Sequence, residues 1–551
     1  MNFFEQIYRK YSIQIIFFLF LLFGLLTYKD YGVSIDEKFQ RLNGFFWLEY
    51  LFNFTDFQNF KYLISEKISS ITNDATLPSI KQYNFYGIFF DLPASFLEIL
   101  FNIQDTNKVY NLRHLLNFLY FFLGSIFFYR ILINRFDRSS SLFGTLLFIL
   151  SPRIYGESFY NSKDIIFLSF LCIAIFYCFE FYKRKKIINI ILFSLFSAIC
   201  IQTRIIGIFL PLVFGLFYFF SVLSYKKAIS SLKIYLLYFI LTFVFLYTLW
   251  PYLWESPIIN FFNIFFNLSL YTPDIKIFFD GEYINVKYMP FDFLPTWIFI
   301  STPVINIILF IIAVILLFTR IFKRLVTFEN LNNNFDLWRS MSEKKDLFIL
   351  FSFLIIFTLL ISFNISLVNS WRYVFFLNIF IIYLATFSIY IFFNFLKEKN
   401  FLLSIKIFLI ILIIFNFYKL IQYHPFQGLY FNSLISKNYK SKFEVDYGSI
   451  SGKHAINWIL NNDDRNKKIN LAVSSWSPLN RNLETFSKIQ KNSIDIIGQN
   501  YTEADYIFNN NISEVDKSIH KKYDIPKDFY KIYTFEIDDV IIYELFKKRA
   551  L

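Results

Sequence analysis

The chain has 551 residues, of which 56% are hydrophobic, 23% aromatic and only 17% charged. Soluble globular domains carry about 25% charged residues, so this composition excludes a soluble enzyme, a disordered chain and a fibrous repeat. The formal net charge of +13 would suit a nucleic-acid binder. Most of that excess, however, lies among apolar stretches, where basic residues set membrane orientation instead.

Apolar runs of membrane-spanning length recur through the first 420 residues, and they predict an α-helical polytopic membrane protein. The first run is expected to be a retained anchor, because Arg9 and Lys10 precede it and no small-residue cleavage site follows. About eleven spans are expected, near 11–27, 113–133, 141–155, 164–182, 187–203, 205–223, 234–250, 297–319, 347–363, 373–396 and 401–421.

Lysine and arginine gather in alternate connections between these spans. The positive-inside rule assigns such connections to the cytoplasm, which puts the N-terminus inside and, with an odd number of spans, the C-terminus outside. We therefore expect a multi-pass protein of the cytoplasmic (inner) membrane whose chemistry faces away from the cytoplasm. The basic connections are 130–138, 183–186, 226–233, 320–345 and 397–406.

Three parts are expected on the outer side: the loop 28–112, the loop 251–296 and the tail. In the first loop the apolar piece 85–103 is interrupted by charged residues and a proline, which predicts a helix lying along the interface rather than a further span. The expected organisation is a transmembrane domain over 1–421, which includes both loops, and an extracytoplasmic domain over 422–551.

The tail is expected to be a small mixed α/β domain. Its pattern predicts a helix at 450–460 and a strand at 469–474. A hairpin is predicted from 532–537 and 540–546, which flank Asp538 and Asp539.

Several charged residues fall at the outer ends of the expected spans. A carboxylate near a membrane is costly unless it faces water or a partner, and any single one could be an ordinary hydrated loop charge. Together, acids and fixed cations suit a reaction with a phosphate leaving group: an acid deprotonates an incoming hydroxyl, while cations or a metal stabilise the phosphate. The acids are Asp36, Glu37 and Asp164, and the cations are Lys81, Arg113, Arg153, Lys163, Arg204 and Arg372.

The surrounding motifs resemble a known family. They are Asp36-Glu37 after the first span, SPRIYGESFYNSKD at 151–164, QTRIIGI at 202–208, WRYVFFLNIF at 371–380, and YHPFQGLYFN and DYGSISGKHAINW at the start of the tail. In these motifs the chain is similar to the integral-membrane glycosyltransferases of the GT-C superfamily, which use polyprenyl-phosphate sugars. It most resembles the bacterial branch related to protein O-mannosyltransferases and lipid A aminoarabinose transferases (glycosyltransferase family 39).

The resemblance implies roles for the acids. Asp36 would be the catalytic base that activates the acceptor hydroxyl, with Glu37 as its neighbour in an acidic pair. Asp164 matches a second acid, which in some members shares a divalent metal ion with the first, so Asp36 and Asp164 are the candidate metal ligands. The histidine-rich metal pattern of some relatives is missing, since the chain has only 4 histidines.

The cations would bind the substrate. Lys81 resembles a lysine that approaches the lipid phosphate, and Arg204 and Arg372 resemble outer-face residues that hold it. Arg153 and Lys163 belong to the same stretch as Asp164 and are further candidates. No nucleotide cofactor is expected, because the chain contains no Walker or Rossmann glycine pattern and only 14 glycines.

Together with the resemblance, these observations predict an inverting glycosyltransferase that moves a sugar from a polyprenyl-phosphate donor to a hydroxyl of an acceptor glycan, lipid or protein at the outer face of the cytoplasmic membrane. Nucleic acid is not an expected partner. The alternative is a transporter or flippase of a lipid-linked saccharide, although such proteins often contain internal repeats and none is visible here. A third possibility is a non-catalytic assembly partner that docks through the tail.

Overall fold

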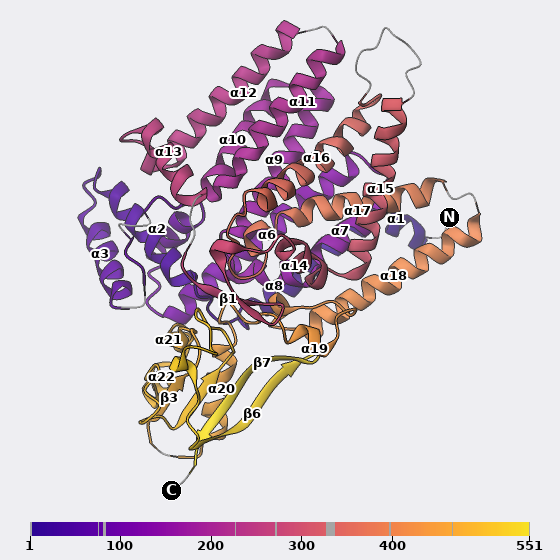
Figure 1. The fold of residues 1–551 in the computed structure, drawn as a ribbon. Helices are drawn as coiled ribbons and strands as arrows, with labels where there is room; N and C mark the ends of the chain where they lie inside the picture. The colour runs from indigo at the N-terminus through magenta and orange to yellow at the C-terminus, as the bar shows by residue number, and fades with distance from the viewer. Residues whose placement is uncertain are drawn as a thin grey trace.

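The structure, a computed structural model, describes residues 3–74, 77–80, 84–225, 228–269, 273–326, 337–395, 398–465 and 467–549. Most of these residues form a bundle of long helices, and the last part of the chain forms a small sheet at one end of that bundle (Figure 1). This arrangement confirms the expectation of a helical polytopic protein with a small α/β region at its C-terminal end.

Eight helices in the described part of the chain are long and apolar enough to cross a membrane. Shorter apolar stretches of α1 (Phe3–Thr27) and α10 (Ile187–Thr203) lie at two further expected spans. The eight are α6 (Thr106–Ile133), α9 (Asp164–Arg184), α11 (Phe209–Tyr225, preceded by η1, Ile205–Ile208), α12 (Ala228–Leu249), α15 (Val304–Val326), α16 (Met341–Ser362), α17 (Leu377–Phe395, preceded by η4, Arg372–Val374) and α18 (Lys399–Gln422).

Two expected spans are wrong as single helices, and proline explains both breaks. The span expected at 141–155 is divided into α7 (Arg138–Ile149) and α8 (Pro152–Tyr160). The span expected at 297–319 is divided into α14 (Phe293–Ser301) and α15, with Pro303 between them. Proline lacks the N–H that would continue a helix, and it restricts the residue before it to extended backbone; both prolines therefore stand at or beside a new helix start.

The connections fall into two groups at opposite ends of the bundle. At one end Arg135, between α6 and α7, contacts Asp346 of α16 at 2.8 Å, and Arg320 of α15 lies 3.6 Å from the same carboxylate. At the other end the 251–296 loop meets the tail, where the Lys276 N–H donates to the Glu514 carbonyl at 3.0 Å. The expected division into two faces therefore holds, while the side that faces the cytoplasm stays a prediction.

The loop 28–112 folds into short helices over the end that carries the sheet (Figure 1). They are α2 (Glu37–Phe52), α3 (Gln58–Thr72) and α5 (Asp91–Leu100). The ten-residue α5, within the expected piece 85–103, is too short to cross a bilayer. Two buried ion pairs fix it, Arg41 with Glu98 at 2.5 Å and Arg113 with Asp91 at 2.8 Å.

The loop 251–296 contains one amphipathic helix and a small hairpin. Its elements are η2 (Pro251–Leu253), α13 (Pro257–Ser269), β1 (Lys276–Phe279), β2 (Glu282–Asn285) and η3 (Val286–Tyr288). The hairpin packs against the start of the tail, where the Glu444 N–H donates to the Phe278 carbonyl at 3.2 Å.

The tail forms a five-stranded sheet of order β4-β3-β5-β7-β6, in which β3 runs parallel to both β4 and β5. The expected helix, strand and hairpin are confirmed. Asp538 and Asp539 both adopt positive φ (52° and 64°), as two-residue hairpin turns require. The elements are η5 (Gln427–Leu429), α19 (Lys437–Lys440), α20 (Gly452–Asn462), β3 (Ile469–Val473), α21 (Leu479–Leu483), α22 (Lys488–Ser493), β4 (Ile494–Ile496), β5 (Tyr506–Asn509), η6 (Lys521–Tyr523), β6 (Phe529–Ile537) and β7 (Val540–Lys548).

The tail packs closely on the bundle through buried polar contacts. The Tyr31 hydroxyl donates to Gln427 at 2.9 Å, and the Val33 N–H donates to Asn482 at 2.9 Å. A stack of three aromatic rings continues inward from this contact, with Tyr31 on Phe159 at 4.3 Å and Phe159 on Phe118 at 5.1 Å. Because buried polar groups need partners, these contacts fix the sheet against the bundle end.

Candidate active site at the junction of bundle and tail

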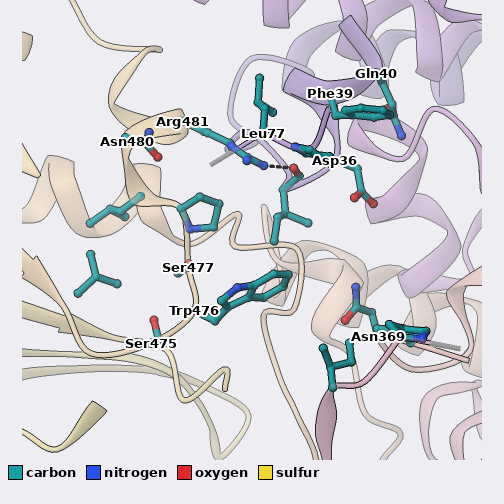
Figure 2. A pocket seen from close by; sticks show the side chains of 18 of the residues that line it. Asp36, Phe39, Gln40, Leu77, Asn369, Ser475, Trp476, Ser477, Asn480 and Arg481 are labelled. Atoms are coloured by element: carbon teal, nitrogen blue, oxygen red, sulfur yellow. Dashed lines mark hydrogen bonds between the residues drawn. The ribbon is translucent and has the colours of Figure 1, made fainter. Parts of the chain in front are cut away.

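A cavity of about 830 Å³ lies between the end of the bundle and the tail. The residues after β3 and β4 form one wall, as is common in open α/β sheets, where ligands bind beyond the carboxyl ends of parallel strands. Figure 2 shows Asp36, Phe39 and Gln40 on one side of this space and Ser475, Trp476 and Asn480 on the other. Further lining residues come from the 28–112 and 251–296 loops, the start of α9, η1, the stretch around η4, and η6.

Asp36 provides a carboxylate to the cavity. It occupies the N-cap position of α2, yet its side chain accepts no hydrogen bond from that helix. It instead meets the Arg372 guanidinium at 2.6 Å and remains 45% exposed. Burial raises its pKa, but Arg372, Lys163 and Arg204 outweigh this effect and hold the pKa of Asp36 below its ordinary value. The carboxylate is therefore ionised at neutral pH.

Two arginines of the cavity lie close to one aromatic ring, that of Tyr373. The guanidinium of Arg372, in η4, lies 5.1 Å from the ring centre of Tyr373, and that of Arg204 lies 4.7 Å from it. Arg204 also pairs with Asp164 at 2.5 Å. Both arginines keep a buried Nε–H for which the described residues supply no acceptor. An unsatisfied buried donor costs free energy, and an anion would offer acceptors to these groups.

Lys163 is the third cation of the cavity. Its ammonium lies 3.8 Å from the ring centre of Tyr86, and within the described chain it makes neither an ion pair nor a hydrogen bond. Lys163 also occupies the N-cap of α9, where the helix dipole disfavours a positive charge. Burial lowers its pKa to about 8, against the opposing effect of Asp91 and other nearby carboxylates.

Asp164 lies behind the cavity wall. It is 2% exposed and is the first residue of α9. One of its oxygens accepts from the Asn161 amide at 2.9 Å, and the other faces Arg204. These contacts position Arg204. Asp164 itself does not line the cavity.

Two other predicted residues, Glu37 and Arg153, do not line the cavity. Glu37 is buried and points away from the cavity, where it accepts from the Ser34 N–H at 2.7 Å and contacts His114 at 3.0 Å. Arg153 is buried against the Trp297 ring at 5.1 Å and donates to the Tyr430 carbonyl at 3.0 Å. Lys81 lies outside the described residues.

The side chains around Asp36 and Asp164 decide whether these two residues could hold a metal ion. Among the described residues, no group of three or more His, Cys, Asp or Glu side chains could hold a metal ion. Asp36 and Asp164 each face an arginine at 2.6 and 2.5 Å, so their negative charge is already matched. The described residues thus do not fit a divalent metal site.

The wall that the tail contributes was not predicted from the sequence. This wall contains Trp476, Asn480, Arg481 and Gln499, and the Arg481 guanidinium donates to the Ile35 carbonyl beside Asp36 (Figure 2). One signal was available. The stretch SSWSPLNRN follows an expected strand, and polar residues at the carboxyl end of a parallel strand often bind ligands.

Comparisons with family models and with curated proteins find no match for this chain. Among solved structures, the chain is similar to the apo oligosaccharyltransferase of Archaeoglobus fulgidus, at 12% identity and a TM-score of 0.44 over 76% of this chain and 57% of that one. It is also similar to ArnT from Cupriavidus metallidurans bound to undecaprenyl phosphate, at 11% identity and a TM-score of 0.43 over 97% and 98% of the two chains.

A third similar structure is the oligosaccharyltransferase AglB from Archaeoglobus fulgidus in complex with an inhibitory peptide and a dolichol-phosphate, at 11% identity and a TM-score of 0.40 over 77% of this chain and 61% of that one. The chain thus spans little more than half of the archaeal enzyme named first and nearly all of ArnT. At these identities and TM-scores, function has to be argued from the residues of the site.

Proposed function

We propose that this protein is an inverting glycosyltransferase of the cytoplasmic membrane that moves a sugar from a polyprenyl-phosphate donor to an acceptor hydroxyl. The observation that supports it best is the meeting of one ionised, half-exposed carboxylate with three cations in one cavity. Asp36, Lys163, Arg204 and Arg372 all line that space. The cavity lies at the end of the bundle that we expect to face outward, where a lipid-borne donor would reach it from the bilayer.

The cations are suited to stabilise the phosphate leaving group. Cleavage of the bond between the anomeric carbon and the phosphate oxygen leaves both electrons on polyprenyl phosphate, so negative charge grows there in the transition state. Fixed cations that face this charge lower the barrier without further reorganisation. Lys163 is the best placed of the three, because no carboxylate among the described residues forms an ion pair with its ammonium group.

Asp36 is suited to activate the nucleophile, the acceptor hydroxyl. In an inverting transfer, the acceptor oxygen attacks the anomeric carbon from the face opposite the phosphate, and Asp36 takes the hydroxyl proton as the new bond forms. Arg372 touches the Asp36 carboxylate at 2.6 Å and has further N–H groups for a phosphate oxygen. One guanidinium would thereby hold the base and the leaving group in a fixed relation.

The first test is Asp36→Asn. General-base assistance is typically worth about 10²–10⁴-fold, so this variant is expected to lose turnover by roughly that factor and to keep normal expression. The assay uses purified protein in lipid with radiolabelled polyprenyl-phosphate sugars and follows acceptor-dependent release of polyprenyl phosphate. Asp280→Asn is the matched control, because the Asp280 carboxylate is 49% exposed and also pairs with a cation but does not line the cavity.

The same assay separates the rival function. Unchanged turnover in Asp36→Asn would remove Asp36 from the role of base. Movement of intact donor between leaflets, with no cleavage and no dependence on Asp36, would instead identify a transporter of lipid-linked saccharides.

A further inference from the structure

We propose that the tail wall of the cavity is a saccharide-binding subsite centred on Trp476, and that the acceptor of the reaction is a glycan. This inference rests on the proposed function and names its acceptor class. Trp476 follows β3 and is 44% exposed, although it lines the cavity. Its ring stands between the tail backbone and the side of the cavity where Asp36 and Asn369 lie (Figure 2).

An exposed tryptophan in a polar cavity suits one face of a sugar ring. Pyranose rings present C–H groups on their faces and hydroxyls around their edges, so they stack on a flat aromatic surface and hydrogen-bond at the rim. Tryptophan offers a large rigid surface of this kind. A ring stacked on Trp476 would present its hydroxyl edge towards the bundle side of the cavity, where Asp36 lies.

The residues around Trp476 supply the polar rim. Ser475 is 1% exposed, lines the cavity and keeps a buried hydroxyl for which the described chain provides no partner. An unpaired buried hydroxyl is costly, and a sugar hydroxyl would satisfy it. Asn480 and Gln499 add amide groups to the same wall, and amides can donate and accept hydrogen bonds at once.

The geometry favours a glycan over a peptide. Extended peptides usually bind by adding a strand to an exposed sheet edge. The edge strands here are β4, with three residues, and β6, with nine, and β6 lies on the far edge of the sheet from the cavity wall. The cavity lies instead beyond the strand ends of β3 and β4. Its volume of about 830 Å³ falls in the upper part of the range of about 300–1,000 Å³ for small-molecule sites, and this leaves room for an acceptor sugar beside a donor sugar.

The test is direct glycan binding by the full-length protein in detergent. Fluorescently labelled protein is applied to an array of bacterial oligosaccharides and, in parallel, to an array of Ser/Thr-rich peptides. We expect retention on a subset of glycans, and for a retained glycan a dissociation constant about tenfold higher in Trp476→Ala, with partial recovery in Trp476→Phe. Tyr530→Ala is the matched control, because Tyr530 is 45% exposed on the far edge strand β6.

A second arm separates this inference from the proposed function. Binding of undecaprenyl phosphate is measured on the same preparations, and Trp476→Ala is expected to match the parent. Glycan binding that survives Trp476→Ala, absence of any bound glycan, or retention on peptides alone would overturn the saccharide subsite. Failure of the parent protein to bind undecaprenyl phosphate would count against the donor half of the proposed function instead.

Discussion

Lys163 is the cation of the cavity whose charge changes near neutral pH. Because its pKa is lowered to about 8, the ammonium form dominates below pH 8 and is lost above it. Donor affinity is therefore expected to fall as the pH rises from about 7 to 9.5, and to level off where Arg204 and Arg372 alone face the phosphate. The measurement is the dissociation constant of undecaprenyl phosphate across this range.

Lys163→Arg gives the control for this pH dependence. Arginine stays charged throughout the range, so the variant is expected to flatten the profile even if its affinity differs from that of the parent. Lys163→Met is expected to bind weakly at every pH. A profile that is flat in the parent, or unchanged in Lys163→Arg, would show that another group controls binding.

The acidic pair illustrates what the sequence can predict at the scale of single residues. Asp36 and Glu37 are adjacent carboxylates, and only the family resemblance singled out Asp36 as the expected base. Their places at the start of α2 send them in opposite directions: Glu37 turns back to the Ser34 N–H, while Asp36 makes no cap and faces Arg372. Charge and position along the chain therefore indicated the right region, but only helix geometry shows which acid reaches the cavity.

At the scale of elements, the break between α7 and α8 allows a close contact with the tail. Gly156 of α8 faces η5, and a methyl group built on Gly156 would lie 2.6 Å from the Gly428 nitrogen. Gly156→Ala gains about 1 kcal/mol of helix propensity. Overpacking against a backbone atom costs about 1–3 kcal/mol, and we expect the cost to win because the backbone cannot rotate away. The free energy of unfolding, measured in detergent, should fall.

Gly448→Ala is the matched control for this substitution. Gly448 lies in the same junction, but the nearest atom to a methyl group there is 3.6 Å away, which is an ordinary contact distance. This variant is expected to be close to neutral. Equal stability of the two variants would mean that α8 and η5 can separate without penalty.

Helices were predicted well where one uninterrupted apolar run corresponds to one helix, as in α9 and α18. The errors fall at Pro152 and Pro303, where apolar composition continues through a break in the helix. Hydropathy measures the preference of side chains for lipid and does not register a missing N–H. The expected span 141–155 therefore included the first residues of α8. This short helix is rich in polar residues and fully buried.

At the scale of the whole molecule, the orientation in the membrane can be tested by cysteine labelling. The three native cysteines are buried, so the background reaction is expected to be low. In intact cells, a membrane-impermeant maleimide should label Ile489→Cys, at a tail position 81% exposed. It should leave Arg184→Cys unlabelled until the cells are opened, because Arg184, 54% exposed, lies at the opposite end of the bundle. The reverse pattern would contradict the outward-facing tail.

The cavity itself could be predicted only in part. The sequence indicated the bundle side, where Asp36, Lys163, Arg204 and Arg372 follow span ends. The tail wall depends on contacts between residues hundreds of positions apart, such as Val33 with Asn482 and Ile35 with Arg481. No local pattern encodes such pairs, because each member is an ordinary polar loop residue on its own.

The order of the cavity walls along the chain has a consequence for biogenesis. Asp36 leaves the ribosome early, and the last apolar helix, α18, ends at Gln422. Trp476 and Gln499 are made after every span has been synthesised. A chain that stops before the sheet therefore lacks the tail wall of the cavity.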